Sequence, residues 1–443
     1  MQRKLTEGRP FKLLLGFMMP ILAGCLLQQL YNITDSIIVG QALGVTALAS
    51  VGATGSLHFL ILGFCIGLCN GFAIPIAQEF GANDMDRLKS LVASLVPLCL
   101  IFSLCLTATT AILAKPLLLI MQTPKDIVDL STTYIRILFL GIPMTILYNT
   151  TSAIIRALGD SRTPLLFLLI SAVMNIFLDI LLVVVIPMGV AGAAIATVIA
   201  QGFSGLICLA YMRRKYSFLL SGKKDRKLYR RLLMNGVPMG LQYSVTAIGS
   251  VILQANVNIL GSSAVASITA GSRIYALFAS PFDAMGSAMA TYSGQNTGAG
   301  TLPRLREGLK DCSIMSAIYS LCAFAILYFL GGELASLFIA AGTDPAIIEN
   351  AHLFLIIVSL FYFPLAWVNI YRFTIQGMGF SELAIISGVL EMIARIAVGV
   401  LAVPAWGFTA ACFASPAAWI LADSFLLPAF EACYKKLKAR QAQ

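Results

Sequence analysis

Apolar residues along this chain come in long uninterrupted runs that are separated by short polar gaps. A run of about 18 or more apolar residues is long enough to cross a bilayer of roughly 30 Å. Lipid offers no partner for a free backbone N–H or C=O, so every run is expected to be an α-helix. The pattern predicts an all-α integral membrane protein with twelve crossings, near residues 13–37, 54–79, 92–114, 133–156, 165–186, 190–212, 236–259, 271–296, 313–334, 352–376, 382–402 and 407–432.

Composition and charge agree with this reading. Apolar residues make up 59% of the chain and charged residues only 11%, whereas a soluble domain carries roughly 25% charge. The net charge of +10 comes from Lys and Arg in alternate gaps, most densely between residues 213 and 231 and in the C-terminal tail. The positive-inside rule therefore places both termini and the 213–231 loop in the cytoplasm, with the chain in the plasma membrane. Such a basic rim contacts anionic membrane lipids, and no nucleic-acid partner is expected.

The two halves of the chain resemble each other at an offset of 217 residues, and residues 44–87 align with 261–304. The paired residues include Gly44 and Gly261, Ser50 and Ser267, Gln78 and Gln295, Gly81 and Gly298, and Arg87 and Arg304. Six helices followed by six in the same orientation form a parallel repeat, a plan that binds substrate between its halves. We therefore expect an N-terminal six-helix bundle over 1–212, a basic cytoplasmic linker over 213–235 and a pseudo-symmetric C-terminal bundle over 236–443.

A few polar side chains interrupt the apolar helices of the first half. An ionised group at the bilayer centre costs at least about 2.5–3.5 kcal/mol, so Asp35 and Asp179 are functional candidates. Asn175 lies one helical turn before Asp179, and Thr197 lies on the following helix. Supporting polar residues on the same helix faces are Gln28, Tyr31, Asn32, Ser171 and Gln201.

Two carboxylates, an amide and a hydroxyl are oxygen ligands that suit Na⁺, or two acids that share one proton. No Lys or Arg lies within the three helices that carry them. The alternative is that Asp35 and Asp179 merely pair with basic or backbone groups inside the bundle.

The second half does not reproduce this set, because Asp35 aligns with Ile252. At an offset of 220, Ser171 and Asn175 align with Glu391 and Arg395, which are four residues apart and predict an internal ion pair. Coupling chemistry is therefore expected in the N-terminal half only. An aromatic cage can hold an organic cation, and the candidates for a substrate cavity are Asp283, Gln254, Tyr275 and Tyr371.

Other classes of protein fit less well. The ten cysteines fall almost entirely inside apolar segments and are interpreted as packing thiols, and His58 and His352 suggest no metal pair. We find no catalytic constellation, so no enzymatic activity and no cofactor are expected. A channel or a receptor is disfavoured, because the pattern of a selectivity loop is missing.

Several motifs together resemble the multidrug and toxin extrusion (MATE) family of exporters, in its prokaryotic form, over nearly the whole chain. They are DSIIVG at 35–40 with ALA at 47–49, Gln78 with Gly81, RALGDSRTP at 156–164, Asn175 with Asp179, Pro187 with Gly189, and Thr197. The resemblance implies two bundles around a V-shaped central cavity. It also implies antiport, in which Na⁺ or H⁺ enters while an organic, often cationic and amphipathic, small molecule leaves.

Carried over to this chain, the resemblance assigns Asp35, Asn175, Asp179 and Thr197 to an N-terminal cation site. It assigns Pro20 to a bend in the first helix, whereas the seventh helix, with Gln254, lacks the acid found in other members. The protein is expected to act as a monomer. A lipid-linked precursor flippase of similar plan is the alternative, but its cavity would need several Arg and Lys residues, which the first, fifth and sixth helices lack.

Overall fold

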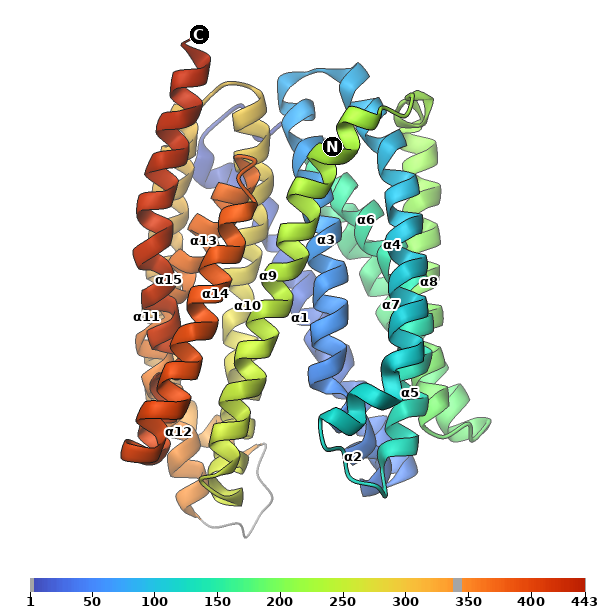
Figure 1. Cartoon of the computed structure of the whole chain (residues 1–443), viewed down its shortest axis with the longest axis vertical. Helices are drawn as coiled ribbons and strands as arrows, with labels where there is room; N and C mark the ends of the chain where they lie inside the picture. The colour runs from blue at the N-terminus through green and yellow to red at the C-terminus, as the bar shows by residue number, and fades with distance from the viewer. Residues whose placement is uncertain (1–3, 338–344, 443) are drawn as a thin grey trace. The chain divides into compact units, whose positions relative to one another are not determined.

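The computed structural model describes residues 4–337 and 345–442, and this part is helical throughout without a β-strand (Figure 1). The helices are α1 (Pro10–Leu43), α2 (Val45–Ala53), α3 (Gly55–Ala82), α4 (Met85–Ile120), α5 (Val128–Leu140), α6 (Ile142–Ala157), α7 (Arg162–Asp179), α8 (Val190–Lys215), α9 (Arg226–Asn258), α10 (Ser262–Gly298), α11 (Pro303–Ser336), α12 (Pro345–Leu360), α13 (Tyr362–Gly377), α14 (Glu382–Ala397) and α15 (Val403–Gln441). Each predicted crossing falls on one of these helices or on a bent pair of them. The short helix α2 was not predicted, because its nine residues are too few to stand out.

The crossings can be counted from length and hydropathy in the described residues. Eight stretches are long and apolar enough to cross a membrane, and two bent pairs, α5 with α6 and α12 with α13, raise the number to ten. One of the eight, Glu382–Gln441, is broken at Gly407, whose backbone is not helical, and so contains two segments. The 37-residue α10 is long enough to cross but carries Arg273 and Asp283. Counted in this way, the helices give the twelve expected crossings.

Two predicted helices are bent, and proline explains both bends. The axis turns by 45° between α5 and α6 and by 50° between α12 and α13. Pro143 and Pro364 lie just after these breaks. A proline has no N–H to donate and its ring clashes with the carbonyl four residues earlier, so the helix cannot continue straight.

The described residues form two compact units. The first, called here the N-terminal unit, comprises Lys4 and Ala23–Ser244, and the C-terminal unit comprises Leu5–Leu22 and residues 245–442. The expected division into 1–212, 213–235 and 236–443 leaves α1 in one part, whereas these units divide α1 near Pro20 and α9 near Pro238. The predicted linker region holds the end of α8, a 3₁₀ turn over Ser217–Ser221 and the start of α9.

The backbone repeats its special conformations in both units. Gly44 and Gly261 precede α2 and α10 with φ of 83° and 96°, a region that favours glycine. Gly189 and Gly407 have φ of 64° and 60°. Helix α7 continues into a π-helical segment at Ile180–Val185, and α14 continues into another at Val398–Ala402. The sequence repeat is thus also a repeat of local structure.

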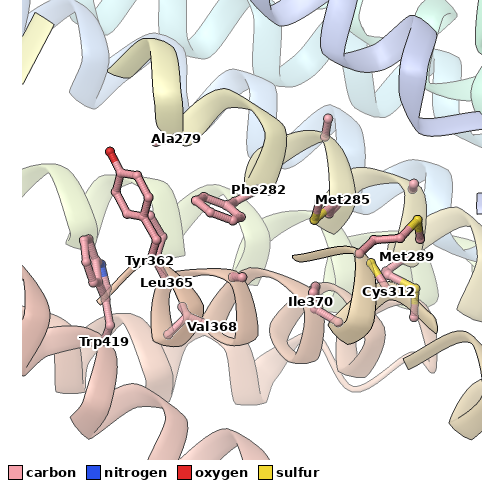
Figure 2. Packing of buried hydrophobic residues seen from close by; sticks show 14 of the residues in the cluster. Ala279, Phe282, Met285, Met289, Cys312, Tyr362, Leu365, Val368, Ile370 and Trp419 are labelled. Atoms are coloured by element: carbon pink, nitrogen blue, oxygen red, sulfur yellow. The ribbon is translucent and has the colours of Figure 1, made fainter. Parts of the chain in front are cut away.

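The core of the C-terminal unit is built from aromatic, aliphatic and sulfur-containing side chains together with small ones (Figure 2). Phe282 on α10 and Tyr362 on α13 are fully buried, and their rings meet edge to face at 5.4 Å. Tyr275 stacks on Trp419 of α15 with ring centroids 6.2 Å apart. Small residues let the helices approach, which is how helices pack in a membrane.

In the N-terminal unit, α3 and the first part of α9 touch backbone to backbone. A Cβ atom on Gly67 or Gly71 would lie 2.5 Å from the carbonyl oxygen of Met239 or Asn235, respectively. Only glycine fits at these two positions without a shift of the helices.

Candidate functional site

Helix α7 turns its polar residues toward the interior of the N-terminal unit. Ser171, Asn175 and Asp179 are only 6%, 2% and 1% exposed, and their spacing of four residues places them on one helix face. The Ser171 hydroxyl donates a hydrogen bond of 2.7 Å to the carbonyl oxygen of Ala200, so it ties α7 to α8. The π-helical segment begins directly after Asp179, and such segments are common at functional sites.

Asp35 on α1 and Asp179 on α7 lie close enough for their carboxyl groups to interact. In the described residues, neither oxygen of Asp179 has a hydrogen-bond partner, nor does Oδ1 of Asp35. Both polar side-chain atoms of Asn175 are likewise buried without a partner. No Lys, Arg or His within the described part of the chain forms an ion pair with either acid.

Buried polar groups in proteins are almost always hydrogen-bonded, and an unpaired buried carboxylate is especially costly. The arrangement therefore lacks a positive charge, which a cation or a proton would supply. The alternative in which the two acids pair with basic side chains finds no support in the described residues.

The other predicted residues surround this acid pair to different degrees. The Thr197 hydroxyl donates to the Ala193 carbonyl at 3.1 Å, which leaves its oxygen lone pairs available. Tyr31 lies against Gln28, Gln201 and Asp35, and Gln201 accepts a 2.6 Å hydrogen bond from Thr145. Asn32 is exposed, and no hydrogen bond in the described residues joins its side chain to the cluster.

Tyr134 on α5 lies beside the acid pair, a place that the sequence did not assign to it. It lies within electrostatic reach of Asp35, Asp179 and Tyr31. Its helix comes from a different part of the chain, and a tyrosine in a membrane helix is usually interfacial, so no local signal pointed to it. Its phenol places an aromatic wall and one hydroxyl beside the acid pair.

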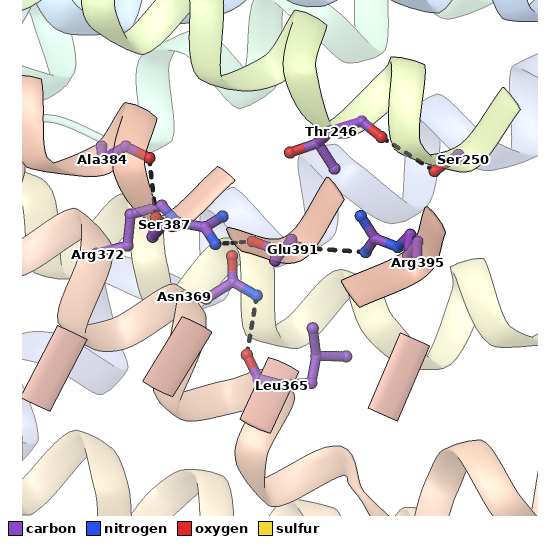
Figure 3. A network of polar contacts seen from close by, with 9 residues as sticks. All are labelled: Thr246, Ser250, Leu365, Asn369, Arg372, Ala384, Ser387, Glu391 and Arg395. Carbon is purple, nitrogen blue, oxygen red and sulfur yellow. Dashed lines mark hydrogen bonds and ion pairs between the residues drawn. The ribbon is translucent and has the colours of Figure 1, made fainter. Parts of the chain in front are cut away.

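The C-terminal unit contains a charged network of its own (Figure 3). Arg395 donates a 3.1 Å hydrogen bond to Glu391, one turn away on α14, which confirms the predicted pair. Arg372 of α13 binds the other oxygen of Glu391 and donates a 3.0 Å bond to Ser387. All three charged residues are at most 6% exposed. Arg372 was not foreseen, because its partner lies 19 residues away on another helix.

Two further acids lie within electrostatic reach of Arg372. Asp283 on α10 is exposed, whereas Asp423 on α15 is 7% exposed and its Oδ1 has no hydrogen-bond partner in the described residues. Asp423 was not foreseen from the sequence, and it adds a second buried acid to Glu391 in the C-terminal unit. The two units differ in the charges beside their buried acids, because Arg372 and Arg395 lie beside the acids of the C-terminal unit.

Three of the four candidate cavity residues lie around this network. Tyr275 is near Asp283 and Glu391, and Tyr371 is near Asp423. Tyr371 also packs against Trp367 and Phe430. Gln254 is exposed on α9 and donates a 3.0 Å hydrogen bond to Asn258, and no contact given for the described residues joins it to the others.

A repeated scaffold of membrane-length helices with charged groups inside it defines a multi-pass membrane transporter. A family model described as MatE matches residues 20–181 and 238–401, one segment in each half of the repeat. The chain therefore belongs to the MatE family.

The names of similar proteins support this family membership. The chain is 30% identical over 366 residues to "Probable multidrug resistance protein YpnP" of Bacillus subtilis, a match that covers 82% of this chain and 81% of the relative. It is 24% identical to the "FAD transporter" of Shewanella oneidensis, with 81% and 80% of the two chains covered. A solved structure titled "Outward-facing conformation of a multidrug resistance MATE family transporter of the MOP superfamily" has a TM-score of 0.90 at 22% identity, over 99% of both chains.

Proposed function

We propose that this protein is an antiporter that exports organic compounds, often cationic and amphipathic, in exchange for Na⁺ or H⁺. One observation carries the proposal: Asp35 and Asp179 lie together inside the N-terminal unit, and no basic side chain of the described residues neutralises them. The names of several relatives as multidrug proteins support export of organic molecules.

The available donors fit a cation that moves as cargo. Unpartnered oxygens come from Asp35, Asn175 and Asp179, and Thr197 adds a hydroxyl oxygen. Hard cations prefer such oxygen ligands, and Na⁺ would be held by these four residues. A proton shared between the two acids would serve the same purpose, because two close carboxylates resist joint ionisation. Either a bound Na⁺ or a shared proton would compensate the negative charge of the two carboxylates.

Coupling requires that the cation and the organic compound favour different states of the protein. A ligand shifts a conformational equilibrium only by its difference in affinity between the two states. We propose that cation binding at Asp35 changes the packing of α1, and that the helix bends at Pro20, which lies inside α1, to take up the change. A membrane potential that is negative inside favours cation entry by about 2.3 kcal/mol per charge per 100 mV.

Replacing the ions separates the two forms of coupling. In proteoliposomes with the purified full-length protein, we expect export of a fluorescent organic cation to fall about tenfold or more when one driving ion is removed. If Na⁺ drives export, replacing Na⁺ by choline at fixed pH causes this fall. If H⁺ drives export, collapsing the pH gradient at constant Na⁺ concentration causes it. Export that survives both treatments contradicts the proposal.

A further inference from the structure

Arg156 near the end of α6 is a cation without a counter-charge. Its Nη1 donates a 2.6 Å hydrogen bond to the Ser152 hydroxyl, and its Nη2 donates a 3.0 Å bond to Oδ1 of Asn70 on α3. No Asp or Glu of the described chain forms an ion pair with it. The groups whose charge would act on it most are Tyr148, Cys25, Cys208 and Tyr243, which are neutral near pH 7.

The guanidinium still has donors to offer. Arginine carries five N–H groups, and the two bonds above use only part of them. Nε makes no hydrogen bond in the described residues, and the side chain as a whole is half-buried. A half-buried guanidinium with free N–H donors is suited to bind a carboxylate or a phosphate through two parallel hydrogen bonds.

Arg156 is connected to the acid pair through aromatic side chains. Tyr148 lies near Arg156 and near Tyr31, and Tyr31 lies near Asp35. Along α1, Cys25 is close to Arg156, and Asp35 follows ten residues later, a rise of about 15 Å. The N-terminal unit thus holds a cation without an ion-pair partner and an acid pair without a basic partner in the described residues, and Tyr148 and Tyr31 lie between the two.

We propose that Arg156 binds an anionic group, a carboxylate or a phosphate, on the transported compound. The preferred cargo is then a zwitterionic amphiphile, and a molecule whose acid is blocked binds more weakly. This inference rests on the proposed export function and names the substrate class for it. A lipid headgroup phosphate has the same chemistry, so the experiment must distinguish the two sources.

Tetramethylrhodamine and its methyl ester form a matched pair of probes, because the acid is a zwitterion and the ester is a cation of nearly the same shape. Binding is measured by fluorescence anisotropy on the full-length protein in nanodiscs of phosphatidylcholine. We expect the wild type to bind the acid about tenfold more tightly than the ester, the size of effect that one charge-assisted contact gives. In Arg156→Gln the ratio of the two dissociation constants falls to about one. Arg156→Lys, which keeps the charge, retains part of the preference.

Arg162→Gln is the matched control, because Arg162 is an exposed arginine six residues along the chain, and it should keep the wild-type ratio. Equal binding of acid and ester by the wild type overturns the inference, even if Arg156→Gln does not fold. A preference for the acid that disappears when phosphatidylglycerol is added to the nanodiscs also overturns the inference. In that case Arg156 binds the phosphate of a lipid headgroup and not the anionic group of the transported compound. If the protein exports the ester in an ion-dependent way but binds acid and ester equally, the inference about Arg156 fails and the proposed function stands. A preference in a protein that exports neither dye contradicts the proposed function alone.

Discussion

Asp35→Asn is expected to abolish export while the protein is still made and inserted. An asparagine has nearly the same shape but no charge, so it removes the site's ability to attract Na⁺ or to take up a proton. Half of the acid pair is lost, and substrate release no longer depends on the cation. In everted membrane vesicles, we expect accumulation of a fluorescent organic cation to fall at least about tenfold, the scale of a typical coupling free energy.

The matched control is Asp86→Asn. It removes a carboxylate whose side chain is 96% exposed and whose one ion pair within residues 4–337 and 345–442 is with Lys89, one turn away. Such surface pairs contribute about 0–1 kcal/mol, so vesicles with this variant should accumulate dye as the wild type does. An immunoblot of the vesicles verifies equal amounts of protein. Ion-coupled accumulation that persists in Asp35→Asn would show that the cation acts elsewhere.

Glu391→Gln should lower the stability of the protein in detergent more than any change at the surface. Glu391 forms ion pairs with both Arg372 and Arg395, and all three side chains are buried (Figure 3). Removing one partner of a buried ion pair typically costs about 3–5 kcal/mol, because the remaining charge is left without compensation. Loss of folded protein on heating, followed by fluorescence-detected size-exclusion chromatography, measures the effect.

Glu431→Gln provides the comparison for this change. Glu431 pairs with Arg306 at 2.6 Å, but both side chains are about half exposed, and we expect at most about 1 kcal/mol. If Glu391→Gln instead keeps normal stability and loses transport, the network belongs to the transport machinery and is not a structural brace.

The fold was largely predictable, because bilayer thickness imposes one simple rule on the sequence. Every predicted crossing coincides with a helix or a bent pair, and the repeat seen in the residues returns in the backbone at Gly44 and Gly261. The bends after α5 and α12 were missed although Pro143 and Pro364 were visible. Helix α2 was missed because nine residues carry too weak a pattern.

The candidate site was predictable only where its geometry is local. Asn175 and Asp179 lie one turn apart, and this spacing alone placed them on one face of α7. Tyr134 and Arg372 act through contacts between helices that are distant in sequence, which no single-helix pattern encodes. Asp423 could have been found, because an acid within an apolar run is itself a signal.

The two units use equivalent helices for different purposes. Ser171 and Asn175 on α7 align with Glu391 and Arg395 on α14, and a π-helical segment follows each helix. In the C-terminal unit the charges on this helix neutralise one another. In the N-terminal unit, no basic side chain of the described residues forms an ion pair with Asp35 or Asp179. We propose that a cation or a proton from outside the protein supplies the missing charge, so that a repeated scaffold carries an ion site in one half only.

Cation movement driven by the organic compound tests this account most directly. Proteoliposomes are loaded with substrate, diluted into substrate-free buffer, and followed with a Na⁺-sensitive and a pH-sensitive dye. The account predicts that outward flow of substrate drives entry of Na⁺ or H⁺ in the wild type, and that Asp179→Asn abolishes this entry. Equal cation entry per substrate in wild type and Asp179→Asn would contradict the assignment of the coupling site to the Asp35–Asp179 pair.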